Sequence, residues 1–350
     1  MKFGRSIGLL AALVSALCIG GLLSVTVTTK SYSESYPAVV CPPTIAGLNS
    51  QISLASKKTQ FQRLQNRTTK TAPVKVLRLP VNKDSLLFNT EGVTPVVWQS
   101  KASSWAGGAI CTGPSTSQWF VGGAADITTK GRLVIVNSGL SDAIVDVQSF
   151  TENGKQPVRT ITVVSKNYIV IPTDSLAPGD KYLTVHVAPR SGRVNAFMID
   201  EQSKGLRSLG GDLVNSASTP TKSLLIPAIP NQIIKNTKTL PHTLRVLSPG
   251  DVDASVTAEV LSADGVFVPV GLTSRTVNAG IVTEFQFTPK ITSTVLAIRI
   301  TSTEPVVAAI KSTVTVSGRK DFVWSTSAPE LVPLTIAISG LTPLVSFAGD

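Results

Sequence analysis

Two stretches of the sequence decide the fold: Leu133–Gly154, LVIVNSGLSDAIVDVQSFTENG, and Leu244–Gly265, LRVLSPGDVDASVTAEVLSADG. In both, an extended segment rich in Val, Ile and Leu is followed by a polar break, a second extended segment and a turn. β-Branched residues suit strands, and the closing Asn-Gly and Asp-Gly pairs suit tight hairpins because they accept a positive φ. The turn glycines, Gly154 and Gly265, lie 111 residues apart. This spacing indicates two copies of one β-unit.

The similarity continues beyond these stretches in the same order. Val194-Asn-Ala196 matches Val306-Val-Ala308, 112 residues later, and Asp212-Leu-Val-Asn-Ser216 matches Asp321-Phe-Val-Trp-Ser325, 109 residues later. A unit of this length corresponds to one immunoglobulin-sized sandwich of about 100 residues. We therefore predict an all-β fold, with tandem immunoglobulin-like β-sandwiches after an N-terminal transmembrane helix.

Length and composition agree with several β-domains. The chain has 350 residues, 42% of them apolar, with 22 Pro and 26 Gly spread along it, as expected for short strands joined by turns. The predicted parts are a cytoplasmic tail (1–6), a transmembrane anchor (7–27), an extracytoplasmic basic linker with a cysteine-bearing β segment (28–117), a first β-sandwich (118–221), and a second β-sandwich with an extra C-terminal strand (222–350).

The anchor is predicted from an uncharged run, Ile7–Val27, that follows Lys2 and Arg5. Its 21 residues, at about 1.5 Å each, cover a hydrocarbon core of about 30 Å. Positive charges stay on the cytoplasmic side, so we expect a single-pass protein of the cell membrane with most of its chain extracytoplasmic. Two alternatives remain open: a cleaved signal peptide, and a lipoprotein modified at Cys18.

Two cysteines, Cys41 and Cys111, lie outside this run. In an oxidising compartment the simplest expectation is one disulfide between them. Two buried free thiols are the alternative.

The net charge is +11. The stretch between Lys57 and Arg78 is basic and contains no acidic residue. Such a stretch suits an anionic membrane surface, although a solvated linker explains it as well. Leu48, Ile52, Ala55 and Leu64 hint at a short helix at its start. The predicted anionic-surface contacts are Lys57, Lys58, Arg63, Arg67, Lys70, Lys75 and Arg78.

A search for catalytic chemistry finds no known motif. The two histidines, His186 and His242, read as a strand residue and a turn residue, and no cysteine or histidine spacing suits zinc. Asp200 and Glu201 are adjacent, so on a strand they point to opposite faces. We therefore predict no catalytic residues, no metal, no cofactor and no enzyme activity.

Three tryptophans, Trp98, Trp105 and Trp119, lie within 22 residues of one another. Exposed rings would suit stacking against sugars, whereas packing in a core explains them equally well.

Several short motifs resemble a family of exported or membrane-anchored envelope proteins of high-GC Gram-positive bacteria, which is known only as a domain of unknown function. The resemblance spans about residues 37–335 and implies an extracytoplasmic β-architecture, with no activity to carry over. In the family, the region matching Asp212-Leu213 tends to be followed by Trp, whereas Asn215 stands here. The motifs are Cys41-Pro42-Pro43, Trp98, Cys111 with Gly113-Pro114, Trp119-Phe-Val-Gly-Gly-Ala124, and Asp321-Phe-Val-Trp324 with Ala328-Pro329.

These observations predict a non-enzymatic, membrane-anchored extracytoplasmic protein that binds or organises cell-envelope polymers or a membrane partner protein. An anionic membrane surface is a further predicted partner, and nucleic acid is not, because no nucleic-acid-binding motif occurs. The alternative is a carbohydrate-active envelope enzyme that has no recognisable motif.

Overall fold

The computed structural model describes residues 39–55, 57–66, 68–88, 93–102, 104–234, 238–316, 318–330, 335–338 and 346–348. These residues form an all-β structure of several antiparallel sheets, and the only helical element among them is a 3₁₀ turn, Thr173–Ser175. No helix within the described ranges is long and apolar enough to cross a membrane. The predicted tail (1–6) and anchor (7–27) lie outside the described residues.

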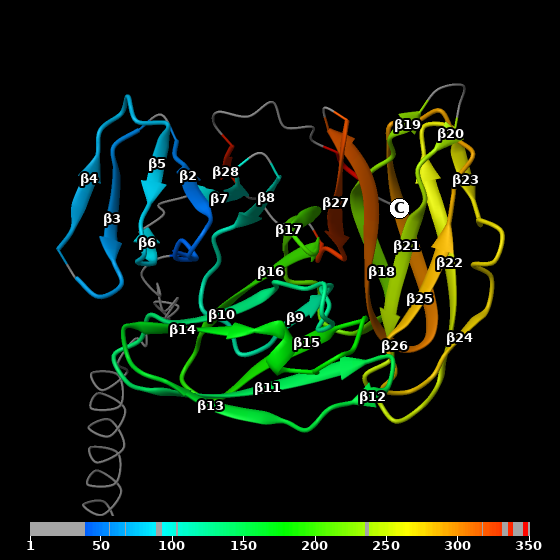
Figure 1. The fold of residues 1–350 in the computed structure, drawn as a ribbon, viewed down its shortest axis with the longest axis horizontal. Helices are drawn as coiled ribbons and strands as arrows, with labels where there is room; N and C mark the ends of the chain where they lie inside the picture. The colour runs from blue at the N-terminus through cyan, green and yellow to red at the C-terminus, as the bar shows by residue number, and fades with distance from the viewer. Residues whose placement is uncertain are drawn as a thin grey trace, which may run out of the picture. The chain divides into compact units, whose positions relative to one another are not determined.

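The N-terminal sheet pair is the cyan and blue part of Figure 1. One sheet has the order β1-β6-β3-β4, and the other has the order β7-β2-β5 with β8 on the far side of β7. The helix expected near Leu48–Leu64 is therefore wrong: this segment forms β2 and β3, since Ser50 and Ile52 are buried with the two-residue period of a strand. The strands are β1 (Val39–Cys41), β2 (Asn49–Ser53), β3 (Thr59–Arg63), β4 (Lys70–Ala72), β5 (Arg78–Val81), β6 (Leu86–Phe88), β7 (Thr94–Lys101) and β8 (Trp105–Ile110).

The central sheet pair follows (green in Figure 1). Its two sheets have the orders β14-β10-β16-β17 and β12-β11-β15-β9, with β13 also paired to β11. The strands are β9 (Gln118–Val121), β10 (Arg132–Asn137), β11 (Ala143–Thr151), β12 (Gly154–Lys155), β13 (Arg159–Val163), β14 (Asn167–Pro172), β15 (Thr184–Ser191), β16 (Asn195–Lys204) and β17 (Arg207–Val214).

The C-terminal sheet pair shares one long strand, β26, between its two layers. The first half of β26 pairs with β18 and β22, and the second half pairs with β21 and β27. The strands are β18 (Thr221–Pro230), β19 (Ile233–Ile234), β20 (Lys238–Thr239), β21 (His242–Leu247), β22 (Ala254–Ser262), β23 (Gly265–Phe267), β24 (Arg275–Val277), β25 (Thr283–Phe287), β26 (Val295–Val316) and β27 (Arg319–Thr326).

The central and C-terminal pairs have the same strand order. The layer β14-β10-β16-β17 corresponds to β25-β21-β26-β27, and β12-β11-β15-β9 corresponds to β23-β22-β26-β18. The register agrees as well, because Leu133 faces Met198 and its counterpart Leu244 faces Ile310. The hairpin glycines Gly154 and Gly265 have φ values of 104° and 122°, as the Asn-Gly and Asp-Gly turns predict.

The predicted extra strand at the C-terminus is found, but in a different place. β28 (Ile336–Ala337) pairs in parallel with β7 of the N-terminal sheet pair, through Ile336 opposite Thr94. The expectation that this tail closes the second sandwich is therefore wrong for the described residues. The tail lies beside an N-terminal strand whose pairing partner is far away in the sequence, so no local pattern points to it.

Candidate functional site

β17 packs against two other strands, β8 and β27 (Figure 1). Each of the three strands lies at an edge of its own sheet. Two glycines permit the close approach of β8 and β17. A Cβ on Gly107 would lie 2.4 Å from a carboxylate oxygen of Asp212, and a Cβ on Gly211 would lie 2.6 Å from the ring of Trp105. Because a residue with a Cβ does not fit at these positions, the two glycines let the strands approach this closely.

Equivalent aspartates join β17 and β27. The backbone N–H of Trp324 donates to Asp212 at 2.7 Å, and the backbone N–H of Gly211 donates to Asp321 at 3.0 Å. Burial raises the pKa of the Asp212 carboxyl well above its usual range, although the backbone donors Trp324 and Leu213 act to lower it. The two carboxylates therefore serve as hydrogen-bond acceptors between edges that have no backbone ladder.

At one end of these strands, the turns of three hairpins surround a groove. The hairpins are β7–β8, β16–β17 and β26–β27, and we call their shared surface the three-hairpin groove. It consists of two hollows of about 550 and 410 Å³ that share Ser104 and Arg319. Its polar and charged lining residues are Ser100, Lys101, Ser104, Arg207, Ser208, Arg319, Lys320 and Asp321.

The groove is basic. Lys101, Arg207, Arg319 and Lys320 line it, against one carboxylate, Asp321. That carboxylate accepts bonds from Gly211 and Phe322, and burial raises its pKa. Guanidinium groups bind carboxylates and phosphates in two-pronged geometry, and serine hydroxyls supply further donors. The arrangement suits an anionic, hydroxyl-rich ligand.

Sequence reasoning missed the residues of this groove. Arg207, Arg319 and Lys320 were not among the predicted contacts, which all fall between residues 57 and 78. A signal was present, because the turn glycines Gly205 and Gly318 are each followed closely by arginine. Recognising it requires knowing that two hairpins more than 100 residues apart lie side by side, which the repeat alone does not say.

A buried polar network lies where the central and C-terminal sheet pairs meet. Asp200 is fully buried and accepts a hydrogen bond from the indole N–H of Trp324 at 2.9 Å and two from the Gln202 amide at 3.2 and 3.3 Å. Lys311 donates to the Gln202 carbonyl oxygen at 3.1 Å. Burial lowers the pKa of Lys311, although Asp200 acts to raise it.

Arg245 crosses the same junction. Its side chain, 3% exposed, donates to the backbone carbonyls of Gly123 and Leu183 and to the carboxylate of Glu284. Its guanidinium also lies 4.8 Å from the ring centre of Trp324. The residue therefore joins the C-terminal pair to the central pair through a buried charge that is paired with Glu284.

The predicted acid pair separates as expected for a strand. Asp200 faces Trp324, whereas Glu201 forms an ion pair with Lys101. Asp212 lies opposite Asp200 on the neighbouring strand, but both side chains are buried and hydrogen-bonded. Across the part of the chain that the structure describes, no group of three His, Cys, Asp or Glu residues is arranged to hold a metal ion.

Both histidines have structural partners. His186 stacks on Trp119, with ring centres 4.0 Å apart, and meets the hydroxyl of Ser117 at 2.9 Å. The expectation that His242 lies in a turn is wrong, because it begins β21 and lies in the C-terminal core between Ser312 and Asn231. Burial lowers the pKa of both rings, that of His242 to about 4.

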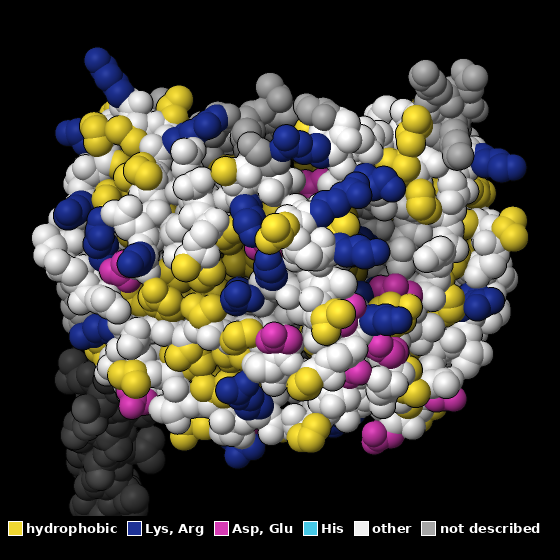
Figure 2. Space-filling model, viewed as in Figure 1, with side chains coloured by type: hydrophobic (Ala, Val, Ile, Leu, Met, Phe, Trp, Pro, Cys, Tyr) yellow, Lys and Arg dark blue, Asp and Glu magenta, His cyan; other side chains and the backbone are white. Residues whose placement is uncertain are grey.

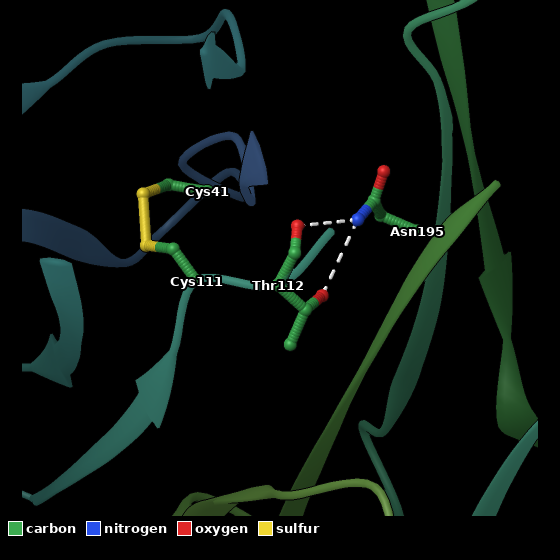
Figure 3. Close-up of a disulfide and its surroundings, with 4 residues drawn as sticks. All are labelled: Cys41, Cys111, Thr112 and Asn195. Atoms are coloured by element: carbon green, nitrogen blue, oxygen red, sulfur yellow. Dashed lines mark hydrogen bonds between the residues drawn. A yellow bond between two sulfur atoms is a disulfide. The ribbon is translucent and has the colours of Figure 1, made fainter. Parts of the chain in front are cut away.

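The predicted disulfide between Cys41 and Cys111 is present (Figure 3). The residues next to the cysteines, Val40 and Thr112, exchange backbone hydrogen bonds of 2.8 and 3.2 Å. Asn195 of β16 donates to the carbonyl of Thr112 at 2.6 Å and to its hydroxyl at 3.3 Å. The disulfide therefore lies directly beside the junction with the central sheet pair.

The three tryptophans are held by the fold. Trp105 and Trp119 are 4% and 7% exposed, and Trp98 donates its indole N–H to Ser53 at 2.8 Å. Gly108 lies against the ring of Trp98, where an added Cβ would approach to 2.7 Å. These contacts favour the packing alternative, because sugar stacking needs an exposed ring face.

The predicted basic stretch forms strands rather than a linker. Its residues lie on and around β3, β4 and β5, and most are exposed; Arg67 lies outside the described residues. Lys57 and Lys58 line a cleft of about 680 Å³, and Arg63 lines an apolar recess of about 970 Å³ beside β14. Figure 2 shows Lys and Arg spread over the N-terminal pair and the middle of that face, with Asp and Glu gathered toward the lower right. The stretch is thus a second basic surface, separate from the three-hairpin groove.

Comparison with known proteins gives a family but no activity. A family model described as a family of unknown function (DUF5719) matches residues 97–340. No curated protein was found that matches the sequence.

Solved structures give only weak similarity. Thermotoga maritima 1070 has 15% identity over 32% of this chain and 97% of its own, with a TM-score of 0.24. Infectious bursal disease virus, Gx strain, has 11% identity over 83% and 69%, with a TM-score of 0.16. The chicken CNTN1 FN1–FN3 domains have 11% identity over 83% and 98%, with a TM-score of 0.13. At these TM-scores the similarities support no conclusion.

Proposed function

The chain belongs to the family of unknown function DUF5719, and from that premise we propose that it is a non-enzymatic, membrane-anchored extracytoplasmic protein that binds an anionic envelope polymer in the three-hairpin groove. The observation that carries the proposal is the lining of the groove: Arg207, Arg319 and Lys320 are exposed and lie together at the ends of two hairpins. Repeating carboxylate or phosphate groups along a polymer match such a cluster.

The neighbouring serines favour a polysaccharide over a bare polyanion. Ser104 and Ser208 line the same hollow as the two arginines, and Ser100 lines the adjoining one. Hydroxyl groups both donate and accept hydrogen bonds, as sugar hydroxyls do. A wall polysaccharide with acidic substituents would use both sets of side chains.

The state of the acidic residues supports binding over catalysis. A glycosidase needs two carboxyl groups that face one substrate. Asp200 and Asp212 face each other across two strands, but both are engaged by backbone or tryptophan N–H groups inside the junction. The alternative of a carbohydrate-active enzyme has no comparable observation in its favour.

The disulfide supports the proposed location, because such bonds persist in oxidising compartments. The matching strand orders of the central and C-terminal pairs support the finer proposal that they are tandem immunoglobulin-like sandwiches that arose by duplication. The high-GC Gram-positive envelope as the setting remains part of this proposal.

The test is polymer binding by the full chain. The probes are polygalacturonate, polyphosphate and neutral dextran, which separate carboxylate, phosphate and uncharged ligands. If each cation contributes about 1 kcal/mol, as near an anionic lipid surface, then Arg207→Ala/Arg319→Ala/Lys320→Ala lowers the affinity for the preferred polyanion about 100-fold.

The matched control is Lys57→Ala/Lys58→Ala/Lys70→Ala, which removes the same charge from the other basic surface. We expect it to bind within a few-fold of the unsubstituted protein. Phosphatidylglycerol vesicles are tested alongside the polymers. If the control loses polymer binding and the groove variant keeps it, or if the protein binds the vesicles and none of the polymers, the groove is not the site.

A further inference from the structure

Lys311 and Gln202 face each other at the junction of the central and C-terminal sheet pairs. The Lys311 amine lies 3.1 Å from the carbonyl oxygen of the Gln202 amide. The carbonyl carbon is one bond away from that oxygen, so a nucleophile and an acyl group are already adjacent.

The two residues lie on corresponding strands of the repeat, β16 and β26. Along these strands the two copies are offset by 112 residues, as Met198 and Ile310 are, so Gln202 corresponds to Val314 and Lys311 does not lie opposite its own counterpart. The amine and the carboxamide therefore come from different positions of the repeat, one in each sheet pair.

The surroundings desolvate the Lys311 amine. Its nitrogen lies 4.0 Å from the ring centre of Phe322 and 5.6 Å from that of Trp324; the rings exclude water, although their faces attract a cation. Burial lowers the pKa of Lys311, and the guanidinium of Arg245 acts in the same direction, whereas the carboxylate of Asp200 acts to raise it. A lysine amine attacks a carbonyl only in its neutral form, so desolvation is the activation that this chemistry requires.

Asp200 is placed to move the proton. Its carboxylate oxygens accept hydrogen bonds from the Gln202 nitrogen at 3.2 and 3.3 Å. The indole N–H of Trp324 holds one of the same oxygens at 2.9 Å, which fixes the carboxylate in that position. The acid therefore contacts the atom that would leave.

We propose that Lys311 and Gln202 form an intramolecular isopeptide bond that links the central sheet pair to the C-terminal sheet pair. The neutral amine attacks the amide carbon, and a bond forms between the lysine nitrogen and that carbon. The C–N bond of the carboxamide breaks, and Asp200 carries a proton from the attacking nitrogen to the departing one. The products are one secondary amide and one molecule of ammonia, with no oxidant, reductant or cofactor.

The bond would be a covalent crosslink between the side chains of β16 and β26. It does not depend on what the groove binds. A load applied between the two sheet pairs would then pass through an amide bond instead of through the hydrogen bonds of Asp212, Asp321 and Arg245 alone.

The test is mass spectrometry of the full chain after denaturation and reduction, followed by proteolysis. The bond lowers the mass by one ammonia, about 17 Da, and yields a linked pair of peptides that contain Gln202 and Lys311. Lys311→Arg, which keeps the charge but lacks the nucleophile, and Gln202→Met, which lacks the acyl group, should each give the unmodified mass.

Lys204→Arg is the matched control, because Lys204 lies exposed near Gln202 and the variant should retain the linked peptides. Recovery of both peptides unlinked, from protein kept folded for days at neutral pH, overturns the proposal without reliance on any variant. Loss of ammonia that persists in Lys311→Arg also overturns it, because the loss then arises elsewhere in the chain.

Discussion

Asp212 and Asp321, at equivalent positions of the central and C-terminal sheet pairs, each accept a hydrogen bond from the backbone of the other's strand, at 2.7 and 3.0 Å. The contact is reciprocal, yet the two environments differ. Asp212 is 5% exposed, whereas Asp321 is half-buried beside the groove. The repeat therefore places the pattern that its two copies share, Asp-x-Val, at the surface where the copies meet.

The difference in burial gives the first prediction. Asp212→Ala leaves the backbone N–H groups of Trp324 and Leu213 without their acceptor, which we expect to cost about 3 kcal/mol of unfolding free energy. Asp321→Ala should cost about 1 kcal/mol, since water can replace its carboxylate. Urea unfolding followed by circular dichroism measures both, and equal losses would contradict the assigned roles.

Arg245 gives the second prediction. Arg245→Met leaves the partly buried Glu284 and two backbone carbonyl groups without their partner, so we expect the unfolding free energy to fall by about 4 kcal/mol. The double variant Arg245→Met/Glu284→Met should be less destabilised than the single one, because no unpaired charge remains. Additive losses in urea unfolding would show that the pair is not the main source of the effect.

The sequence predicts those parts of the fold whose signals lie within a few neighbouring residues. Gly154 and Gly265 mark hairpins within a few residues, so the turn, the strands on both sides and the period between copies are visible locally. The pairing of β28 with β7 joins Ile336 to Thr94, and no local pattern encodes it. Arg207 and Arg319 are likewise far apart in the sequence and come together only in the folded chain. The sequence alone therefore does not predict the groove.

The cysteines give the third prediction. Cys41 and Cys111 are 70 residues apart, so replacing both with serine removes a loop constraint worth about 4 kcal/mol on the chain-entropy model. We expect this loss to appear first in the N-terminal sheet pair, as faster amide exchange in β1, β6 and β8. The same loss should follow the addition of reductant to the unsubstituted protein, and insensitivity to reductant would contradict it.

The fourth prediction concerns acid. Burial lowers the pKa of His242 from 6.5 to about 4. As the pH falls, this histidine is therefore protonated in the unfolded chain before it is protonated in the folded chain. Stability from this residue is therefore full above about pH 6.5 and falls as the pH drops toward 4, by on the order of 3 kcal/mol. In His242→Gln, the slope of unfolding free energy against pH in this window should be shallower.

His186→Gln is the control for that slope, since burial also lowers the pKa of His186, but this ring is half-buried whereas that of His242 is fully buried. We expect the smaller change in slope from this variant. A larger change from His186→Gln than from His242→Gln would show that the acid sensitivity lies in the central sheet pair.

Binding in the three-hairpin groove is tested most directly by hydrogen–deuterium exchange of the full chain with and without the preferred polyanion. We predict slower exchange in peptides that cover residues 101–106, 205–209 and 318–321, and no change in residues 57–78. Protection confined to residues 57–78, with the three hairpins unaffected, would contradict the proposed site.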